Sequence, residues 1–483
     1  MSKHQPDPSG SGLLFAVLVI GVMAYALVLA LVSPVLPTIQ RDLGTTHDMI
    51  AWVMTGCLVS AAVFTPILGR IGDRIGKRRV IVVSLLILAA GSFVAAASPD
   101  VGVMIVGRVL QGAGGGVVPL AFSVIRDAFP RERVPRAVGM LSALYAVSGG
   151  LAAVLSGPVS TALGYRALFW IPGLVTLVAA AGAHRLIPAS PHRQPGPVNW
   201  GAAVLLSAWL VALLVPLAQG STWGWSTARV IAPLIASAVL LVAWIRVESR
   251  SASPLIDMRM MRLPAVWTTN AIALLFGLGM YALLASLPYF VQTPSSAGYG
   301  FGVSQTQAGL TNLPMTVAMF VAGLISAKVS ARLSARRLLL GSTLISTVGF
   351  ALLAFVHSGY AVVLVAMAVI GFGFGLAFAT MTSLIINAVP SHQTGAATGM
   401  NANIRTIGGA FGTAIVGNII TAHTLPGGLP AESGYIWAFA TLALAALAAS
   451  AVSLLIPHIG QTDGRAPGES LAGAATAADT TPA

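Results

Sequence analysis

Long apolar stretches, separated by short polar segments, follow one another along almost the whole chain of 483 residues. Fourteen of them approach the roughly 20 residues that an α-helix needs to cross a bilayer. We number them as spans 1 to 14 in chain order, at residues 12–33, 50–69, 80–97, 101–123, 137–158, 167–187, 199–218, 229–246, 265–290, 306–327, 337–356, 360–388, 404–423 and 434–456. The pattern therefore predicts an all-α polytopic membrane protein.

The basic residues predict how these spans are oriented. They gather in short clusters after every second span, so that 22 lie on one side, together with the N-terminus, and three on the other. Cytoplasmic loops carry such an excess of Lys and Arg. We therefore expect both termini in the cytoplasm. One of the 22, Arg405, is counted after span 12, and Arg108 is expected within the bilayer.

Composition and charge narrow the class of protein further. Only 8% of the residues are charged, against about 25% in soluble proteins, and the mean hydropathy is +0.88. The net charge of +13 sits in clusters between apolar runs, which favours membrane topology over nucleic-acid binding. The single cysteine, Cys57, excludes a disulfide or a thiolate metal site within one chain. The first apolar run is too long for a signal-peptide core, so span 1 should stay in the mature protein.

A degraded internal repeat divides the chain into two similar halves. Residues 69–79, GRIGDRIGKRR, align with residues 327–337, AKVSARLSARR. Spans 1 to 6 and 9 to 14 would then form two six-helix bundles, with spans 7 and 8 inserted between them. We expect a cytoplasmic tail at 1–11, an N-terminal bundle at 12–187, a linker with two inserted helices at 188–264, a C-terminal bundle at 265–456 and a disordered cytoplasmic tail at 457–483.

The loop at 69–79 holds more than a topology anchor needs. A plain anchor explains its five basic residues, but not the carboxylate of Asp73 or the three glycines, which let helix ends approach closely. The pattern G-x-x-x-D-R-x-G-K/R-R-R resembles the loop signature of the major facilitator superfamily of transporters. The resemblance implies a conformational switch loop that includes Gly69, Asp73, Arg74, Gly76 and Arg78.

The same resemblance implies a fold and a role for Asp73. Parallel repeats related by an axis along the membrane normal are the architecture of this superfamily. Its matching aspartate pairs with a nearby arginine and with the N-terminus of the helix that here is span 13, near residues 400–404. A carboxylate is favoured at the positive end of a helix dipole. Ala331 stands at the equivalent position of the repeat, so the two halves are not expected to be equivalent.

Span 4 reads VGRVLQGAGGG from Val106 and is similar to the superfamily's motif of a buried arginine, here Arg108 followed by Gln111 and Gly112. A guanidinium inside the membrane is costly and by default marks function. The alternative is a structural ion that bonds to backbone carbonyls or to Gln111.

Span 5 carries Gly157 and Pro158, the centre of the pattern G-x-x-x-G-P-x-x-G-G of antiporter members. The match is partial because Ala153, Thr161 and Ala162 replace the outer glycines. We expect Pro158 to kink the span.

Fourteen spans, the segment PLIDMRMMRLP from Pro254 and the segment GMNANIRTIGGAFGTAIVG from Gly399 resemble the drug:proton antiporter family with 14 spans. The resemblance implies alternating-access efflux of small lipophilic or amphipathic compounds, as in multidrug efflux and antibiotic resistance. It implies a monomer in the bacterial cytoplasmic membrane that is not an enzyme. No cofactor, metal or nucleic-acid partner is expected.

Proton coupling is left open by the distribution of acids. Val28 occupies the position where that family carries an acid in span 1, and all thirteen acids of the chain fall in tails, loops or helix ends. Proton relays need a titratable group whose environment changes between two access states. The protein is therefore either an uncoupled facilitator or is coupled through boundary acids, with Asp42, Asp73 and Asp127 as candidates.

The substrate cavity is expected between spans 1, 2, 4 and 5 and spans 9, 10, 12 and 13. Its candidate residues are the polar or aromatic side chains within the bilayer, namely Tyr25, Thr55, Arg108, Tyr145, Tyr281 and Asn312. Each of them also suits an ordinary helix contact.

Other classes of protein remain as alternatives. The first is a lipid or metabolite facilitator without ion coupling. A membrane enzyme would need a cluster of His, Asp or Glu at one depth, but the eight histidines are scattered. A channel would need a polar ring or filter, and the sequence has no such repeated element.

Overall fold

The computed structural model describes residues 8–130, 132–188, 199–251, 253–390, 393–425 and 429–457. Within these ranges the chain is helical, apart from one isolated bridge between Thr424 and Pro430. Most of the proline-rich linker after span 6, most of the predicted N-terminal tail and nearly all of the predicted C-terminal tail lie outside the described residues.

Helices carry almost all of the spans expected from the sequence. Before residue 251 they are α1 (Pro8–Ala30), η1 (Ser33–Val35), α2 (Leu36–Asp42), α3 (His47–Ile75), α4 (Lys77–Ala96), α5 (Val101–Ala113), η2 (Gly114–Gly116), α6 (Val117–Ala128), α7 (Val134–Leu163), α8 (Ala167–Leu186), α9 (Trp200–Trp223) and α10 (Ala228–Arg250). After it they are α11 (Met258–Met261), α12 (Pro264–Gln292), η3 (Ser295–Ala297), α13 (Gln305–Leu310), α14 (Leu313–Ser330), α15 (Ala335–Phe355), α16 (Tyr360–Ala388), α17 (Thr394–Ala422) and α18 (Glu432–Ser453).

Local sequence signals place several helix ends. The side chains of Thr46, Asp100 and Asn199 accept hydrogen bonds from the first turns of α3, α5 and α9. These bonds satisfy amide groups that a helix start leaves without an intrahelical partner. At the other end of α3, Gly76 has φ +116° and allows the abrupt turn into α4.

Twelve helices among the described residues are long and apolar enough to cross a membrane. The two parts of α7, which meet at 47°, make a thirteenth if they count as one span. The remaining long helix, α17, has 29 residues and is not among the twelve, and its sequence is rich in glycine and polar residues. The prediction of a membrane-spanning all-α fold therefore holds, and the count of fourteen spans stays a prediction.

One expected helix start was wrong, and one expected span contains an interruption. Span 13 was expected at 404–423, but α17 begins at Thr394, because glycines and polar residues hide its first turns from a hydropathy pattern. Span 4, expected at 101–123, is one candidate membrane crossing at Val101–Ala128, in which a 3₁₀ turn at Gly114–Gly116 separates α5 from α6.

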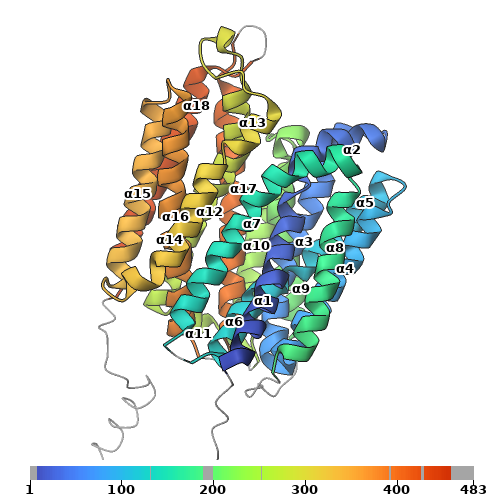
Figure 1. Ribbon diagram of the computed structural model, residues 1–483, viewed down its shortest axis with the longest axis vertical. Coiled ribbons are helices and arrows are strands. Elements are labelled where there is room, and N and C mark those ends of the chain that lie inside the picture. Colours follow the sequence, from blue (N-terminus) through green and yellow to red (C-terminus); the bar gives the residue numbers. More distant parts are fainter. Residues whose placement is uncertain are drawn as a thin grey trace, which may run out of the picture.

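The helices gather on two sides of a central seam (Figure 1). Helices α1 and α3 to α8 lie on one side, and α12 to α16 and α18 lie on the other. The seam is formed by contacts of α17 with α3 and α6 and of α7 with α14 and α16. Helices α9 and α10 pack against each other, and α9 also contacts α3 and α17. The pair therefore adjoins both sides of the seam.

One end of the molecule carries the basic loop, and we call it the loop end. The α3–α4 turn lies there beside the end of α6, because Lys77 and Asp127 form an ion pair at 2.6 Å. The first turns of α7 and the last turns of α14 meet at the same end, where a Cβ on Gly139 would lie 2.7 Å from the Ser326 hydroxyl. The seam therefore closes tightly at the loop end.

Candidate functional site

Asp73 lies at the loop end of α3, where it reaches across the seam. Its side chain is buried, and its Oδ2 accepts a hydrogen bond of 3.1 Å from the backbone N–H of Ala396 in the first turn of α17. A carboxylate is stabilised there by the helix dipole and by the free amide groups. Lys77 Nζ lies 4.0 Å from its Oδ1, and the Ser123 hydroxyl donates to the same oxygen at 3.5 Å.

This geometry corrects the expected partners of Asp73. The helix N-terminus was expected near residues 400–404, and the structure has it at Thr394 because α17 starts earlier. An arginine was expected as the cation, and Arg70 is an electrostatic neighbour of Asp73, but the cation in ion-pair contact is Lys77, which also pairs with Asp127. The arginine at this contact, Arg126, instead donates to the Thr394 hydroxyl at 2.6 Å. The role of Asp73 as a conformational switch stays a prediction.

The loop glycines allow backbones to touch. A Cβ on Gly69 would lie 2.4 Å from the carbonyl oxygen of Gly395, so α3 and α17 are in direct backbone contact at this point. A Cβ on Gly72 would lie 2.2 Å from the side chain of Leu120 in α6. Such distances are far shorter than real carbon contacts. The close approach of α3 to α17 therefore requires glycine at position 69.

Two arginines of the loop, Arg70 and Arg74, connect it to the inserted pair, and Arg70 also has Asp73 as an electrostatic partner. Arg74 is buried, and its Nη2 donates to the carbonyl oxygen of Ser253 at 3.4 Å. Arg70 is also buried, and both arginines have the Glu248 carboxylate as an electrostatic partner. Arg78, another predicted residue of the switch loop, is half-buried in the first turn of α4.

Glu248 was missed as a site residue by sequence reasoning. It lies near the end of α10 with 2% of its surface exposed, although it was expected at a loop boundary. Its Oε2 accepts a hydrogen bond of 3.0 Å from the backbone N–H of Leu255. The next residue, Ile256, is buried with Leu255 against apolar side chains of α3, α10 and α17. The sequence gives no signal of this burial, because the electrostatic partners of Glu248, Arg70 and Arg74, lie far away along the chain.

Arg108 is completely buried and has its hydrogen bonds satisfied by protein groups. Its Nε donates to the backbone carbonyl of Val53, and its Nη1 donates to the backbone carbonyl of Val28 and to the side-chain Oε1 of Gln111, all at 2.8 to 2.9 Å. The amide of Gln111 donates in turn to the Ser92 hydroxyl at 2.9 Å. The guanidinium therefore ties α5 to α1, α3 and α4. This geometry favours the structural alternative for Arg108 over a direct role in binding.

Gly112 belongs to the same contact. A Cβ at this position would lie 2.3 Å from the carbonyl oxygen of Cys57 in α3. The helices α3 and α5 therefore pack backbone to backbone beside Arg108.

The predicted span 5 motif has a different environment. Gly157 and Pro158 lie in α7 and are exposed, and a Cβ on Gly157 would meet no atom within 4 Å. The bend of 47° joins Val134–Ala152 to Val154–Leu163, four residues before Pro158. Proline removes a helical hydrogen bond and clashes with the carbonyl four residues earlier. The bend agrees with the expected kink, whereas a packing role for Gly157 finds no contact here.

Three of the predicted cavity residues come together across the seam. Tyr25 of α1, Tyr145 of α7 and Tyr281 of α12 are electrostatic neighbours. The ring of Tyr145 stacks on that of Phe378 in α16, with centroids 6.0 Å apart and planes at 13°. A Cβ on Gly409 would lie 2.5 Å from the Tyr281 ring. These contacts bring aromatic side chains of both halves together.

Besides Arg108, two predicted cavity residues, Thr55 and Asn312, form no hydrogen bond or ring contact with this group among the described residues. Thr55 is buried in α3. Asn312 is buried at the start of α14, and its Oδ1 has no hydrogen-bond partner within the described chain. Their part in a cavity therefore stays a prediction.

Arg405 is a second buried arginine that the sequence count assigned to a loop. It lies in the middle of α17 with 7% of its surface exposed, and its guanidinium carbon sits 4.6 Å from the centre of the Phe378 ring. Arg405 could have been recognised as a residue inside a helix if the glycine-rich start of α17 had been recognised as helical. Asn401, one turn earlier, donates to Asn270 of α12 at 2.9 Å.

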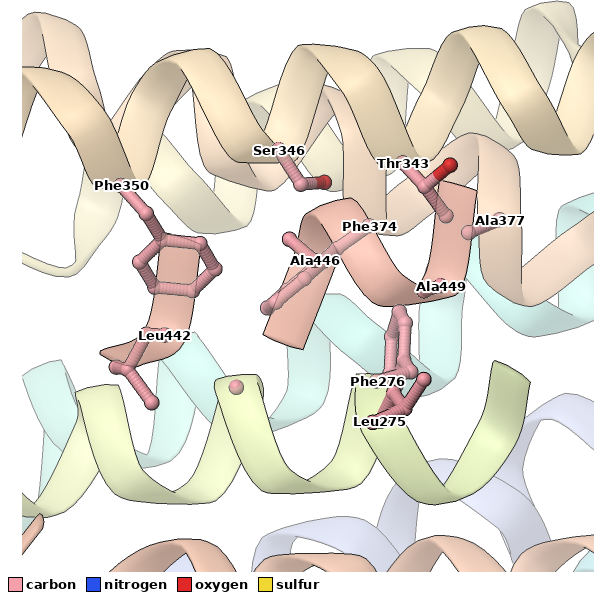
Figure 2. A pocket seen from close by; sticks show the side chains of 11 residues that line it. Leu275, Phe276, Thr343, Ser346, Phe350, Phe374, Ala377, Leu442, Ala446 and Ala449 are labelled. Carbon is pink, nitrogen blue, oxygen red and sulfur yellow. The ribbon is translucent and has the colours of Figure 1, made fainter. Parts of the chain in front are cut away.

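A small cavity lies within the second side rather than at the seam (Figure 2). Its volume is about 20 Å³, and helices α12, α15, α16 and α18 line it with mainly apolar side chains, among them Phe276, Phe350 and Phe374. Its two hydroxyls, Thr343 and Ser346, bond to carbonyls of their own helix. The cavity is thus an apolar packing gap behind the aromatic group. Elsewhere in the described ranges, no three His, Cys, Asp or Glu side chains gather as metal ligands would.

Comparison with known proteins agrees with this arrangement. The family model described as Major Facilitator Superfamily matches residues 18–413. The Multidrug resistance protein 3 of Bacillus subtilis (strain 168) is 27% identical over 408 residues, which are 84% of this chain and 78% of the relative. The Cephamycin export protein CmcT of Amycolatopsis lactamdurans is 28% identical over 464 residues, which are 92% and 93% of the two chains.

A solved structure shares the fold. The crystal structure of the human organic anion transporter MFSD10 (TETRAN) aligns with a TM-score of 0.69 at 16% identity, over 92% of this chain and 100% of that chain. At this identity the likeness concerns the fold alone.

Proposed function

Because the chain belongs to the Major Facilitator Superfamily, we propose that it exports small lipophilic or amphipathic compounds by alternating access. The observation that carries the proposal is the seam, where α3 and α17 touch through Gly69 and Gly395 beside the Asp73 hydrogen bond to Ala396. A contact that is tight at one end and made without bulky side chains can separate and re-form. Relatives named for multidrug resistance and cephamycin export support efflux as the direction of transport.

The proposed topology has fourteen crossings with the loop end in the cytoplasm. The twelve apolar helices, the bent α7 and α17 together account for fourteen. The excess of basic residues at the loop end supports its cytoplasmic placement. We propose two six-helix bundles at 12–187 and 265–456 with α9 and α10 inserted, both termini cytoplasmic, and a monomer in a bacterial cytoplasmic membrane.

In this proposal Asp73 closes the loop end. The state with the Asp73–Ala396 bond is closed toward the cytoplasm, and breaking this bond lets α3 and α17 separate. Moving the charge away from the helix N-terminus costs the favourable dipole interaction, on the order of 1 kcal/mol. That is small enough for a conformational equilibrium to be shifted by substrate or protons.

A second candidate is a lipid or metabolite facilitator without ion coupling. It is favoured by Val28, which stands where the drug:proton antiporters carry an acid, and whose carbonyl oxygen is bonded to Arg108. Acids available for coupling lie near the ends of helices, such as Asp73, Asp127 and Glu248.

Efflux from reconstituted vesicles tests both candidates. Vesicles loaded with a lipophilic dye and containing the purified protein should lose dye faster than protein-free vesicles. Acceleration by a pH gradient supports proton-coupled export, whereas equal rates with and without the gradient support the facilitator. Equal loss from vesicles with and without protein, for dyes and for fluorescent lipids alike, would contradict transport altogether.

A further inference from the structure

We infer that Arg405 is the anchor of a binding site for amphipathic organic anions, that is, for compounds with an apolar ring system and a carboxylate. The inference rests on the proposed transport function and adds the substrate class. The site lies at the seam, where the guanidinium of α17 meets aromatic rings of α7, α12 and α16.

The first observation is that Arg405 is buried without a counter-ion. Across the described residues, its side chain forms no salt bridge and no hydrogen bond, and its close partner is the face of Phe378 at 4.6 Å. A buried charge is normally paired, because removing it from water without compensation costs several kcal/mol. A cation–π contact replaces only part of the lost hydration. The arginine therefore retains capacity for an anion.

The comparison with Arg108 separates a structural arginine from a binding one. Arg108 is also buried, but its donors are taken up by the carbonyls of Val53 and Val28 and by Gln111. The guanidinium of Arg405 has no such set of acceptors within the described chain. A planar guanidinium with free donors fits a carboxylate through two parallel hydrogen bonds.

The distribution of acidic residues determines which ligand charge the site favours. Acidic side chains of the described residues lie near helix ends or in turns, as Asp73, Asp100 and Glu248 do. A lipophilic cation that entered the seam would meet a positive charge and no carboxylate to balance it. An anion would meet the guanidinium of Arg405. Charge complementarity therefore selects against cations and in favour of anions.

The aromatic rings around Arg405 define the rest of the ligand. Phe378 stacks on Tyr145, and its ring centroid lies 6.4 Å from that of Phe276. Phe276 in turn packs against Phe374 at 4.5 Å. Flat apolar surfaces of this kind bind planar ring systems by stacking and burial.

Tyr145 belongs to the first half, and Phe378 and Arg405 belong to the second half. Separation of the halves would therefore change the site, as a transported ligand requires.

Three probes that share one ring system test directly which ligand charge the site prefers. Anthracene carboxylate, its methyl ester and the aminomethyl analogue differ in charge at a single position, and their fluorescence reports binding to the purified full-length protein. We expect the carboxylate to bind at least about tenfold more tightly than the ester, because a charge-assisted hydrogen bond is gained. The aminomethyl analogue should bind most weakly.

Substitutions then assign the effect to Arg405. The Arg405→Gln protein should bind the carboxylate at least about tenfold more weakly and the ester unchanged. Arg405→Lys should recover part of the loss, because the charge remains. The matched control is Arg332→Gln, which removes an exposed arginine at the start of the α14–α15 turn and should bind like the parent. If Arg405→Gln does not fold, the ranking of the three probes by the parent and by Arg405→Lys decides.

The outcomes separate this inference from the proposed function. Equal binding of carboxylate and ester by the parent, or tightest binding of the aminomethyl analogue, would overturn the anion site. Vesicle efflux of all three probes at equal rates would leave the exporter standing and overturn the anion site. Binding of the carboxylate that depends on Arg405, without efflux of any probe, would support the site and contradict transport.

Discussion

Single residues hold the two sides of the seam together at the loop end, and the role of Asp73 can be tested most directly. The Asp73→Asn protein should transport at least several-fold more slowly than the parent, because the amide loses the charge that the α17 dipole and Lys77 favour. Folding should be intact, since asparagine keeps the size and one acceptor oxygen. Transport rate per reconstituted protein is the measurement. Parental transport by a well-folded Asp73→Asn protein would show that the bond is not part of the switch.

Arg108 should not tolerate even lysine. Its hydrogen bonds run from two different nitrogens to two backbone carbonyls and a side-chain amide, and a single ammonium cannot reach them all. Each buried acceptor left without a donor costs about 1–3 kcal/mol. Thermal unfolding in detergent should therefore begin at a clearly lower temperature in Arg108→Lys than in the parent. An unchanged unfolding temperature would show that the guanidinium geometry is dispensable.

Among individual residues, the sequence predicted types better than partners. Buried Arg108 and boundary Asp73 could be recognised because ionised groups are rare in apolar stretches. The partner Ala396 of Asp73 could not be identified, because it lies 323 positions further along the chain, whereas Gln111 was recognised as a possible partner of Arg108. Arg405 was counted on the cytoplasmic side because it stands at the start of predicted span 13, and the glycine-rich turns before it do not look apolar.

At the scale of helices, the close contact of α3 and α17 depends on the absence of side chains. Gly69→Ala would place a Cβ 2.4 Å from a backbone oxygen of Gly395, which cannot turn aside. Overpacking of this kind costs about 1–3 kcal/mol, and it is relieved if the helices separate. We expect the substitution to open the loop end and to slow transport.

A distance across the loop end measures this effect. Spin labels at the exposed positions Arg79 and Arg332, in a Cys57→Ala background, report the separation of the two halves. Gly69→Ala should shift the population toward the longer distance. Gly341→Ala is the matched control, because a Cβ on this helical glycine meets no atom within 4 Å. Equal distance distributions for the parent and Gly69→Ala would contradict the steric argument.

Most helices could be placed from hydropathy alone, because bilayer thickness fixes their length. Spans 12 and 14 were predicted within a few residues of α16 and α18. The exceptions, α17 and the interrupted α5–α6 pair, share clusters of glycine at sites of tight packing. Hydropathy does not record such contacts, since glycine there serves the approach of a neighbouring backbone.

At the scale of the whole molecule, the inserted pair is connected to the seam through Glu248. This carboxylate accepts a hydrogen bond from Leu255 and faces the arginines of α3. Leu255 and Ile256 are buried with Ala397 and Met400 of α17 in one apolar cluster. The segment after α10 therefore touches both α3 and α17 at the loop end, and it should move whenever these helices separate.

Glu248→Gln tests this connection. The amide keeps the shape and can still accept from Leu255, but it no longer attracts Arg70 and Arg74. Two buried arginines would then lose the attraction of this carboxylate, which favours the state that exposes them more to water. We expect the label distance between positions 79 and 332 to lengthen and transport to slow, whereas Glu248→Asp, which keeps the charge, should restore part of both. If Glu248→Gln and the parent give the same distances and rates, the inserted pair is not coupled to the seam through this residue.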